Sequence, residues 1–323
     1  MTQSSPSLQV RVARKEMVAQ DIARFELVDP SGAALPPFEA GAHIDVTVPG
    51  GSLRQYSLCN DPAESHRYQI AVLMEREGRG GSRALHEQVH EGDLLSVGMP
   101  RNLFALHEDA PSSLLIAGGI GITPLLAMAR RLAALGRPFT LHYCARSAAR
   151  AAFREELAQA GFASSVQFHF DDGSAGPALD LKSLLACAGP DVHLYTCGPQ
   201  GFMDAVLSSA RSQGWGDARL HYEFFSAAPV VREDDGSFDV RIASTGQVIR
   251  VPADRSVIQV LEAEGIDIPT ACEQGVCGTC MTGVLEGEPD HRDYYLTPEE
   301  QAENRQFLPC CSRSKSACLV LDL

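Results

Sequence analysis

The first third of the chain alternates apolar and polar residues over short stretches that end at glycine, proline or asparagine. Such alternation is typical of strands with one face on a core and the other in solvent. The clearest stretches cover residues 8–12, 43–48 and 68–73. The pattern predicts a small antiparallel β-barrel over residues 1–107.

From residue 113 the pattern changes to short apolar runs that alternate with longer helical patterns. Strands are expected at 114–117, 139–143, 166–170 and 193–196, and helices at 125–135, 153–159 and 201–213. Alternating strands and helices of this length predict an open parallel sheet covered by helices. This α/β domain is expected over residues 108–226.

A stretch of small, charged and proline residues over 227–236 is typical of an interdomain linker. Two strands near 238–243 and 247–251 and a helix over 256–264 are expected after it. Residues 237–323 are therefore predicted to form a third domain of the α+β class.

Four cysteines of this last region have the spacing C-x4-C-x2-C followed by a distant fourth cysteine: Cys272, Cys277, Cys280 and Cys310. This is the ligand spacing of a plant-type [2Fe–2S] cluster. Structural zinc sites usually combine two short hooks, so zinc fits less well, and disulfides are the other alternative. Spacing alone does not decide whether Cys310 or Cys311 is the fourth ligand.

Charge and hydropathy limit the classes of partner. The formal net charge is −14 at pH 7, which argues against binding to nucleic acids and anionic membranes. From Phe238 onward there are 14 acidic and 7 basic residues, so this end suits a basic partner surface or is simply well solvated. We expect no membrane segment and no signal peptide, and a reducing cytoplasmic location.

Two motifs in the predicted barrel indicate a phosphate-bearing ring ligand. Alternation along a strand sends Arg54 and Tyr56 to one face, where a guanidinium can hold a phosphate and a phenol ring can lie along a flat ring system; a surface pair of the two residues is the alternative. Ser57 faces elsewhere and could hydrogen-bond a flavin nitrogen. Gly80, Gly81 and Ser82 precede a helix, whose first N–H groups are suited to bind phosphate; a capped flexible hairpin tip is the alternative.

Two further motifs lie at the expected carboxyl edge of the parallel sheet. Residues 118–124 contain Gly119, Gly121 and Thr123 between a strand and a helix, where such sheets bind dinucleotide pyrophosphate. The run is not the G-x-G-x-x-G fingerprint, and a tight turn without ligand is the alternative. Cys197, followed by Gly198 and Pro199, ends a later strand and could face a nicotinamide.

Taken in order, these motifs resemble those of the phthalate dioxygenase reductase family, and the resemblance covers essentially the whole chain. It implies an FMN-binding barrel, an NAD-binding domain and a β-grasp ferredoxin domain. It also implies that the chain is an NADH-dependent oxidoreductase that supplies electrons to a Rieske-type oxygenase. A reductase for a cytochrome P450 or another acceptor, and a non-catalytic electron carrier or redox sensor, are the alternatives.

The resemblance also assigns roles to residues. Arg54, Tyr56, Ser57, Leu73, Gly80, Gly81 and Ser82 are expected to bind FMN, and Gly119, Gly121, Thr123, Cys197, Gly198 and Pro199 to bind the nicotinamide nucleotide. Ser57, Cys197, Glu223 and Phe225 are expected to be catalytic. The family pattern of the fourth cluster ligand favours Cys310. NADH is favoured over NADPH, although Arg146 and Arg150, just after the strand that ends near Tyr143, could meet a 2′-phosphate.

Overall fold

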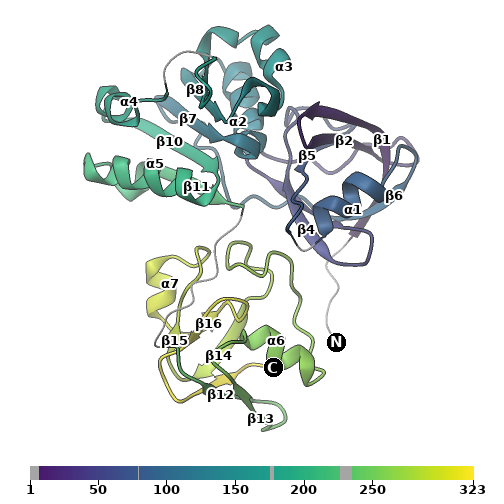
Figure 1. Ribbon diagram of the computed structural model, residues 1–323, viewed down its shortest axis with the longest axis vertical. Helices are drawn as coiled ribbons and strands as arrows, with labels where there is room; N and C mark the ends of the chain where they lie inside the picture. The colour runs from purple at the N-terminus through teal and green to yellow at the C-terminus, as the bar shows by residue number, and fades with distance from the viewer. Residues whose placement is uncertain (1–6, 79, 175–177, 226–234) are drawn as a thin grey trace. The chain divides into compact units, whose positions relative to one another are not determined.

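The computed structural model describes residues 7–78, 80–174, 178–225 and 235–323 (Figure 1). The chain divides into two compact units, Met1–Phe225 and Ser226–Leu323. The first unit contains an antiparallel sheet and a parallel sheet, and the second has sheets of its own. The predicted multidomain fold class is therefore confirmed.

Six strands form the antiparallel sheet of the first unit, in the order β4-β3-β6-β1-β2-β5. Their bounds are β1 (Ser7–Ala19), β2 (Ile22–Val28), β3 (His43–Thr47), β4 (Leu53–Ser57), β5 (Tyr68–Leu73) and β6 (Leu94–Gly98). A bridge between Leu58 and Ile70 joins the two edges, so the sheet curls into a barrel. Helix α1 (Gly81–Gln88) follows β5 and packs Leu85 into the barrel core.

The parallel sheet has the strand order β11-β10-β7-β8-β9. Its strands are β7 (Ser112–Gly118), β8 (Phe139–Ala145), β9 (Val166–Phe170), β10 (Val192–Gly198) and β11 (Leu220–Phe224). Alternate residues of β7 enter different cores: Leu115 packs with α2 (Ile122–Ala134) and α3 (Arg154–Gln159), and Leu114 packs with α4 (Leu181–Cys187) and α5 (Gln200–Ser212). The sheet is therefore covered on both faces.

Two features of this α/β part of the chain differ from the sequence prediction: where helix α2 begins, and the presence of two short elements. Helix α2 begins at Ile122 rather than at residue 125, directly after a turn of 3₁₀ helix at Gly119–Gly121. The first four N–H groups of a helix have no intrahelical partner, so a proline, which lacks this group, is tolerated there. Pro124 is the third residue of α2 and therefore fits inside its first turn. Helix α4 and strand β11 were not predicted, because their apolar patterns are short.

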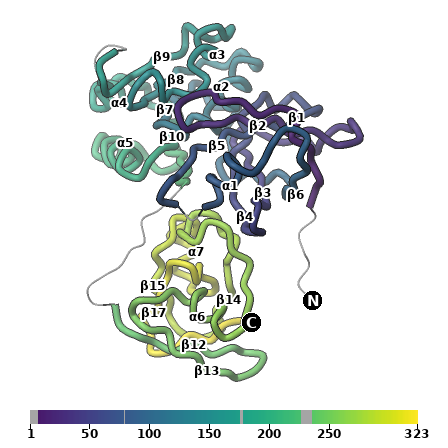
Figure 2. The backbone as a smooth tube through the Cα atoms, turned by 45° about the vertical axis from the view of Figure 1, so that its right-hand side comes forward, coloured from purple at the N-terminus to yellow at the C-terminus, as the bar shows by residue number. Residues whose placement is uncertain are grey.

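The second unit, whose backbone is traced in green to yellow in Figure 2, is built on a mixed sheet with the order β13-β12-β18-β14-β16. Its strands are β12 (Phe238–Ile242), β13 (Val248–Val251), β14 (Thr282–Glu286), β16 (Gln306–Phe307) and β18 (Cys318–Leu321), and β15 (Pro289–Asp290) pairs with β17 (Arg313–Ser314). Helix α6 (Val257–Ala263) packs Val257 and Leu261 into the core of this unit. Helix α7 (Pro298–Ala302) is a single capped turn.

Most of the predicted linker, residues 226–234, lies outside the described residues. Asp235 is described and forms an ion pair with Arg292, so it is anchored to the second unit. The domain boundaries at 107, 226 and 236 remain predictions. In the described part of the chain, no helix combines the length and apolarity that crossing a bilayer requires.

Candidate cofactor sites

Arg54 and Tyr56 lie two residues apart on β4, which pairs with β3, and alternation sends them to the same face. Burial raises the pKa of the Tyr56 phenol to about 12, and the nearby Arg54 charge acts in the opposite direction. The phenol is therefore neutral and sits beside a permanent cation. This arrangement suits a ligand that has both an aromatic ring system and an anionic group.

The start of helix α1 lies against Arg54. A Cβ atom built on Gly81 would come within 2.8 Å of Arg54 Nε, so only glycine lets the guanidinium approach the backbone this closely. Gly80 has a φ of 85°, in the left-handed region that favours glycine. The Ser82 hydroxyl accepts a hydrogen bond of 3.0 Å from the N–H of Glu75, which closes the loop. A guanidinium beside a helix N-terminus fits a phosphate group.

The glycine turn after β7 lies at the carboxyl edge of the parallel sheet, as expected. Gly119 has a φ of 54°. A Cβ atom on Gly121 would lie 2.2 Å from the Cys197 carbonyl oxygen, so glycine is required for the turn to reach the end of β10. The buried Thr123 hydroxyl donates a 3.1 Å hydrogen bond to the Ile120 carbonyl. These contacts fix the turn at the N-terminus of α2.

Phe202 was missed by the sequence analysis. Cβ atoms built on Gly118 and Gly198 would lie 2.8 and 2.7 Å from its ring. The aromatic ring thus packs on two glycines at the ends of β7 and β10, and Pro199 is the N-cap residue of the helix that carries Phe202. Its helical position predicted only an apolar residue, so no sequence signal marked this contact.

Three residues predicted to be catalytic lie together in the first unit. Ser57 Oγ lies 3.4 Å from Glu223 Oε2, to which it donates a long hydrogen bond. Cys197 is paired with Glu223 in the register of β10 and β11. The structure also adds His43, whose Nδ1 lies 3.9 Å from Glu223 Oε1.

Burial dominates the electrostatics of this polar cluster. It raises the pKa of Glu223 to about 8, against a lowering by the Ser57 hydrogen bond. The pKa of the Cys197 thiol is raised well above its usual value by burial and then by Glu223. Burial and then Arg101 lower the pKa of His43 to about 4. At neutral pH these groups are therefore mostly uncharged.

Leu73 and Phe225 lie outside the polar contacts of this cluster. Both are partly buried and pack against the core that α2 shares with the parallel sheet. Arg150, named as a candidate for a 2′-phosphate, has Nη2 3.8 Å from Asp21 Oδ2, so its charge is partly compensated.

In the second unit the cysteine thiols contact one another. Hydrogen bonds with Cys277 and Cys310 lower the pKa of the Cys272 thiol to about 2. Hydrogen bonds with Cys272 and Cys280 raise the pKa of the Cys310 thiol. Backbone N–H groups of Gln274 and Val276 also point at the Cys272 sulfur. Among the described residues, no three His, Cys, Asp or Glu side chains are gathered closely enough to hold a metal ion as they stand.

The backbone of this cysteine loop needs its glycines. A Cβ atom on Gly278, at a φ of 68°, would lie 2.2 Å from the Tyr295 ring. One on Gly275 would lie 2.5 Å from the Cys311 sulfur. Cys311 therefore lies under the loop at Gly275, whereas Cys310 contacts thiols of the three-cysteine stretch. N–H donors aimed at sulfur and a loop without side-chain bulk fit an iron–sulfur cluster.

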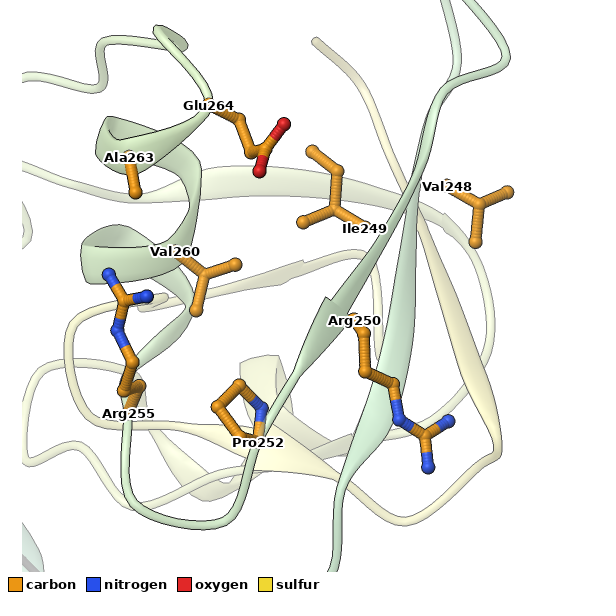
Figure 3. A pocket seen from close by; sticks show the side chains of 8 residues that line it. All are labelled: Val248, Ile249, Arg250, Pro252, Arg255, Val260, Ala263 and Glu264. Carbon is orange, nitrogen blue, oxygen red and sulfur yellow. The ribbon is translucent and has the colours of Figure 1, made fainter.

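An open pocket in the second unit contains none of the predicted site residues (Figure 3). It lies between β13 and α6, with Ile249 and Val260 at its base and Arg250, Arg255 and Glu264 around it. Its shallow, charged lining differs from the enclosed apolar lining of a ring-binding site. The predicted site residues lie instead at the motifs described above.

Two family models match the chain. Residues 115–208 match the "Oxidoreductase NAD-binding domain" and residues 240–315 match the "2Fe-2S iron-sulfur cluster binding domain". The second match includes all four predicted cluster ligands. The fold and these matches define the chain as an oxidoreductase with a nucleotide-binding domain and an iron–sulfur domain.

The relatives identify the family. The chain is 57% identical over 316 residues to "Vanillate O-demethylase oxidoreductase" of Pseudomonas sp. (strain HR199 / DSM 7063), covering 98% of this chain and 100% of the relative. It is 45% identical over 317 residues to "Phthalate dioxygenase reductase" of Burkholderia cepacia, covering 98% and 97%. A solved phthalate dioxygenase reductase superposes with a TM-score of 0.76 at 45% identity, covering 98% of each chain. The chain belongs to the phthalate dioxygenase reductase family.

The solved phthalate dioxygenase reductase is a modular protein for electron transfer from pyridine nucleotides to [2Fe–2S]. The matched domains are described as binding NAD and a [2Fe–2S] cluster, so these two members of the predicted cofactor set are confirmed. The assignment of individual residues to these cofactors stays a prediction.

Proposed function

We propose that this chain is the reductase component of a two-component Rieske-type oxygenase or demethylase that acts on aromatic compounds. It takes electrons from NADH and passes them through FMN and the [2Fe–2S] cluster to the terminal oxygenase. The observation that carries the proposal is the full-length likeness, at 57% identity, to a vanillate O-demethylase oxidoreductase. Phthalate and phenoxybenzoate dioxygenase components are also among its relatives.

The cofactors explain why one chain combines these sites. A bound flavin accepts an electron pair from a nicotinamide nucleotide and returns electrons singly to a [2Fe–2S] cluster, which holds one. The protein's part is to bind, orient and shield these groups.

The described residues fit that part as follows. Arg54 and the N-terminus of α1, at Gly80, Gly81 and Ser82, would hold the flavin phosphate, and Tyr56, Ser57 and Leu73 would flank its ring. The remaining assignments are Gly119, Gly121, Thr123, Gly198 and Pro199 for the nucleotide, Cys197, Glu223 and Phe225 beside the nicotinamide, and Cys272, Cys277, Cys280 and Cys310 for iron.

A cytoplasmic location agrees with the state of the cysteines. No disulfide joins any of the ten, all of which lie in the described part of the chain, as expected in a reducing compartment. The acidic excess of the second unit favours a partner with a basic docking surface. Raised salt should therefore slow reduction of the oxygenase more than reduction of a neutral acceptor.

An anaerobic titration with NADH, followed by visible spectroscopy, tests the proposal. We expect the flavin bands and the iron–sulfur bands both to bleach. In Cys272→Ser, flavin bleaching should persist while reduction of a Rieske-type oxygenase is lost, and the exposed Cys187 provides a matched control as Cys187→Ser. Absence of any bleaching would instead support the non-catalytic carrier.

A second candidate function is reduction of a cytochrome P450. One observation favours it: the chain superposes with a TM-score of 0.84 and 40% identity on part of a self-sufficient cytochrome P450 monooxygenase, covering 98% of this chain and 41% of the other. Steady-state reduction of a P450 and of a Rieske-type oxygenase should be compared at equal concentration. Faster reduction of the P450 would favour this second function.

A further inference from the structure

Lys15 of β1 extends toward the barrel core rather than into solvent. A β-bulge between Val12 and Arg14 shifts the alternation of β1 by one residue. Lys15 is therefore directly opposite Phe25, a fully buried residue of β2, and opposite residues of an antiparallel pair extend to the same face. The ammonium lies 5.4 Å from the centre of the Phe25 ring. A cation on this face needs hydrogen-bond acceptors nearby.

The acceptors are backbone carbonyls at the C-terminal end of α1. Lys15 Nζ donates to the carbonyl oxygens of Leu85, His86 and Val89 at 3.2, 2.6 and 2.7 Å. An ammonium has three N–H donors, so all three are used on one helix end. Val89, the C-cap residue, is extended, so the chain leaves the helix without a capping turn. Lys15 therefore supplies the cap, since the last four carbonyls of a helix have no intrahelical partner.

Tertiary contacts hold α1 in place, because a helix of eight residues is too short to be stable alone. Leu85 packs in the barrel core, and His86 Nε2 lies 2.8 Å from the Val72 carbonyl oxygen of β5. Lys15 adds a charged contact from β1, and a cation at the C-terminal end also stabilises the helix dipole. The C-terminal half of α1 is thus fixed to two strands of the barrel.

The opposite end of α1 is the expected site of the flavin phosphate. The first intrahelical bond runs from the Ala84 N–H to the Gly80 carbonyl oxygen, so the N–H groups of residues 81–83 have no intrahelical acceptor. Gly80, the N-cap residue, has no side chain that could accept from them. N–H groups of this kind bind phosphate when the helix directs them at it. Their direction depends on the placement of the whole helix.

We propose that Lys15 is a positioning residue for the flavin phosphate: by holding the C-terminal end of α1, it fixes the direction of the N–H groups at the other end. The helix is about 12 Å long, at a rise of about 1.5 Å per residue. At that distance solvent and salt largely screen the direct attraction between the ammonium and a phosphate. The effect of Lys15 is therefore carried by the helix. The inference rests on the proposed function, in which this end of α1 binds the phosphate.

Hydrogen exchange on the holoprotein tests the cap without removal of the flavin. Amide N–H groups of α1 should exchange at least about threefold faster in Lys15→Met, whereas those of α2 should be unchanged. Lys15→Gln is a milder second variant, which keeps two N–H donors but no charge. Exchange of α1 at the wild-type rate in both variants would overturn the proposal.

Riboflavin separates the positioning role from a general effect on the barrel, because it has the ring system of FMN without the phosphate. The full-length protein is stripped of flavin and titrated with each ligand, and quenching of flavin fluorescence gives both dissociation constants. We expect Lys15→Met to weaken FMN binding about three- to tenfold and to leave riboflavin binding unchanged. Lys15→Arg, which keeps the charge and the donors, should recover most of the loss. The exposed Lys182 of α4 provides the control Lys182→Met.

Three outcomes of this titration would contradict an inference. Equal losses for FMN and riboflavin in Lys15→Met would give Lys15 a role in barrel stability alone and would overturn the proposal. Unchanged binding of FMN in that variant would overturn it too. If the wild type binds FMN no better than riboflavin, the phosphate site of the proposed function is itself wrong, and the role of Lys15 falls with it.

Discussion

The turn at Gly121 touches the end of β10 at Cys197. A Cβ atom on Gly121 would lie 2.2 Å from the Cys197 carbonyl oxygen and 2.7 Å from the Gly198 nitrogen. The backbone of the turn thus contacts the backbone at the end of β10. Unlike side chains, these backbone atoms cannot move aside by rotating about a side-chain bond. The contact joins the turn that is expected to bind pyrophosphate to the residues expected beside the nicotinamide.

Gly121→Ala should therefore destabilise the parallel-sheet part of the first unit by about 1–3 kcal/mol, because the methyl group forces the two backbones apart. Trp215 is the chain's single tryptophan and is buried there, so urea unfolding followed by its fluorescence reports on this part. Gly201→Ala is the matched control, since no atom lies within 4 Å of its added Cβ. Equal stability of the two variants would contradict the close contact.

Gly278→Ala should reduce the cluster content of the second unit. The added Cβ would overlap the Tyr295 ring at a φ of 68°, so the cysteine loop would have to open. Gly246→Ala is the control: Gly246 has a similar φ of 72°, but no atom lies within 4 Å of its added Cβ. It therefore shows the effect of backbone strain alone, about 1–2 kcal/mol, without the clash. Iron and acid-labile sulfide should fall in the first variant only.

Cys310→Ser and Cys311→Ser should differ in how much of the iron–sulfur cluster they retain. The Cys310 thiol contacts Cys272 and Cys280, whereas Cys311 lies against Gly275. We expect Cys310→Ser to lose most of the cluster absorbance and Cys311→Ser to retain it. The opposite result would make Cys311 the fourth ligand, the alternative that spacing left open.

Glu223 should make stability depend on pH. Its pKa is raised to about 8 from a usual value of 4.5, so the folded chain holds a proton that the unfolded chain loses, and stability falls as pH rises between these values. Glu223→Gln removes this loss. We expect its stability relative to the wild type to rise by a few kcal/mol at most between pH 5 and pH 9, measured by urea unfolding at both pH values. A difference that does not change with pH would refute the raised pKa.

Arg54→Gln should weaken FMN binding by about tenfold or more, because a charge-assisted hydrogen bond to phosphate contributes about 1.5–3 kcal/mol. Titration of the flavin-free protein, followed by quenching of FMN fluorescence, measures the affinity. The control is Arg76→Gln, in the loop between β5 and α1, whose side chain is 75% exposed. If both variants bind alike, the phosphate lies elsewhere.

Local pattern was sufficient where one short segment contains the whole signal. The glycine turn after β7 and the strand that carries Arg54 and Tyr56 lie where turn residues and alternation predicted them, although helix α2 begins at Ile122, inside the predicted turn. Short elements such as α4 and β11 were missed, because a few apolar residues predict neither helix nor strand.

The sequence by itself determined the fold class through its hydrophobic period, and its ordered motifs carried the resemblance that implied the family and the cofactor set; both signals are local properties of the chain. Only the tertiary structure decided that His43 lies beside Ser57 and Glu223, although the serine and the glutamate are 166 positions apart in the chain. It also decided that Phe202 packs on Gly118 and Gly198. Strand register and burial control these contacts and the shifted pKa values, and both arise only when distant segments pack together.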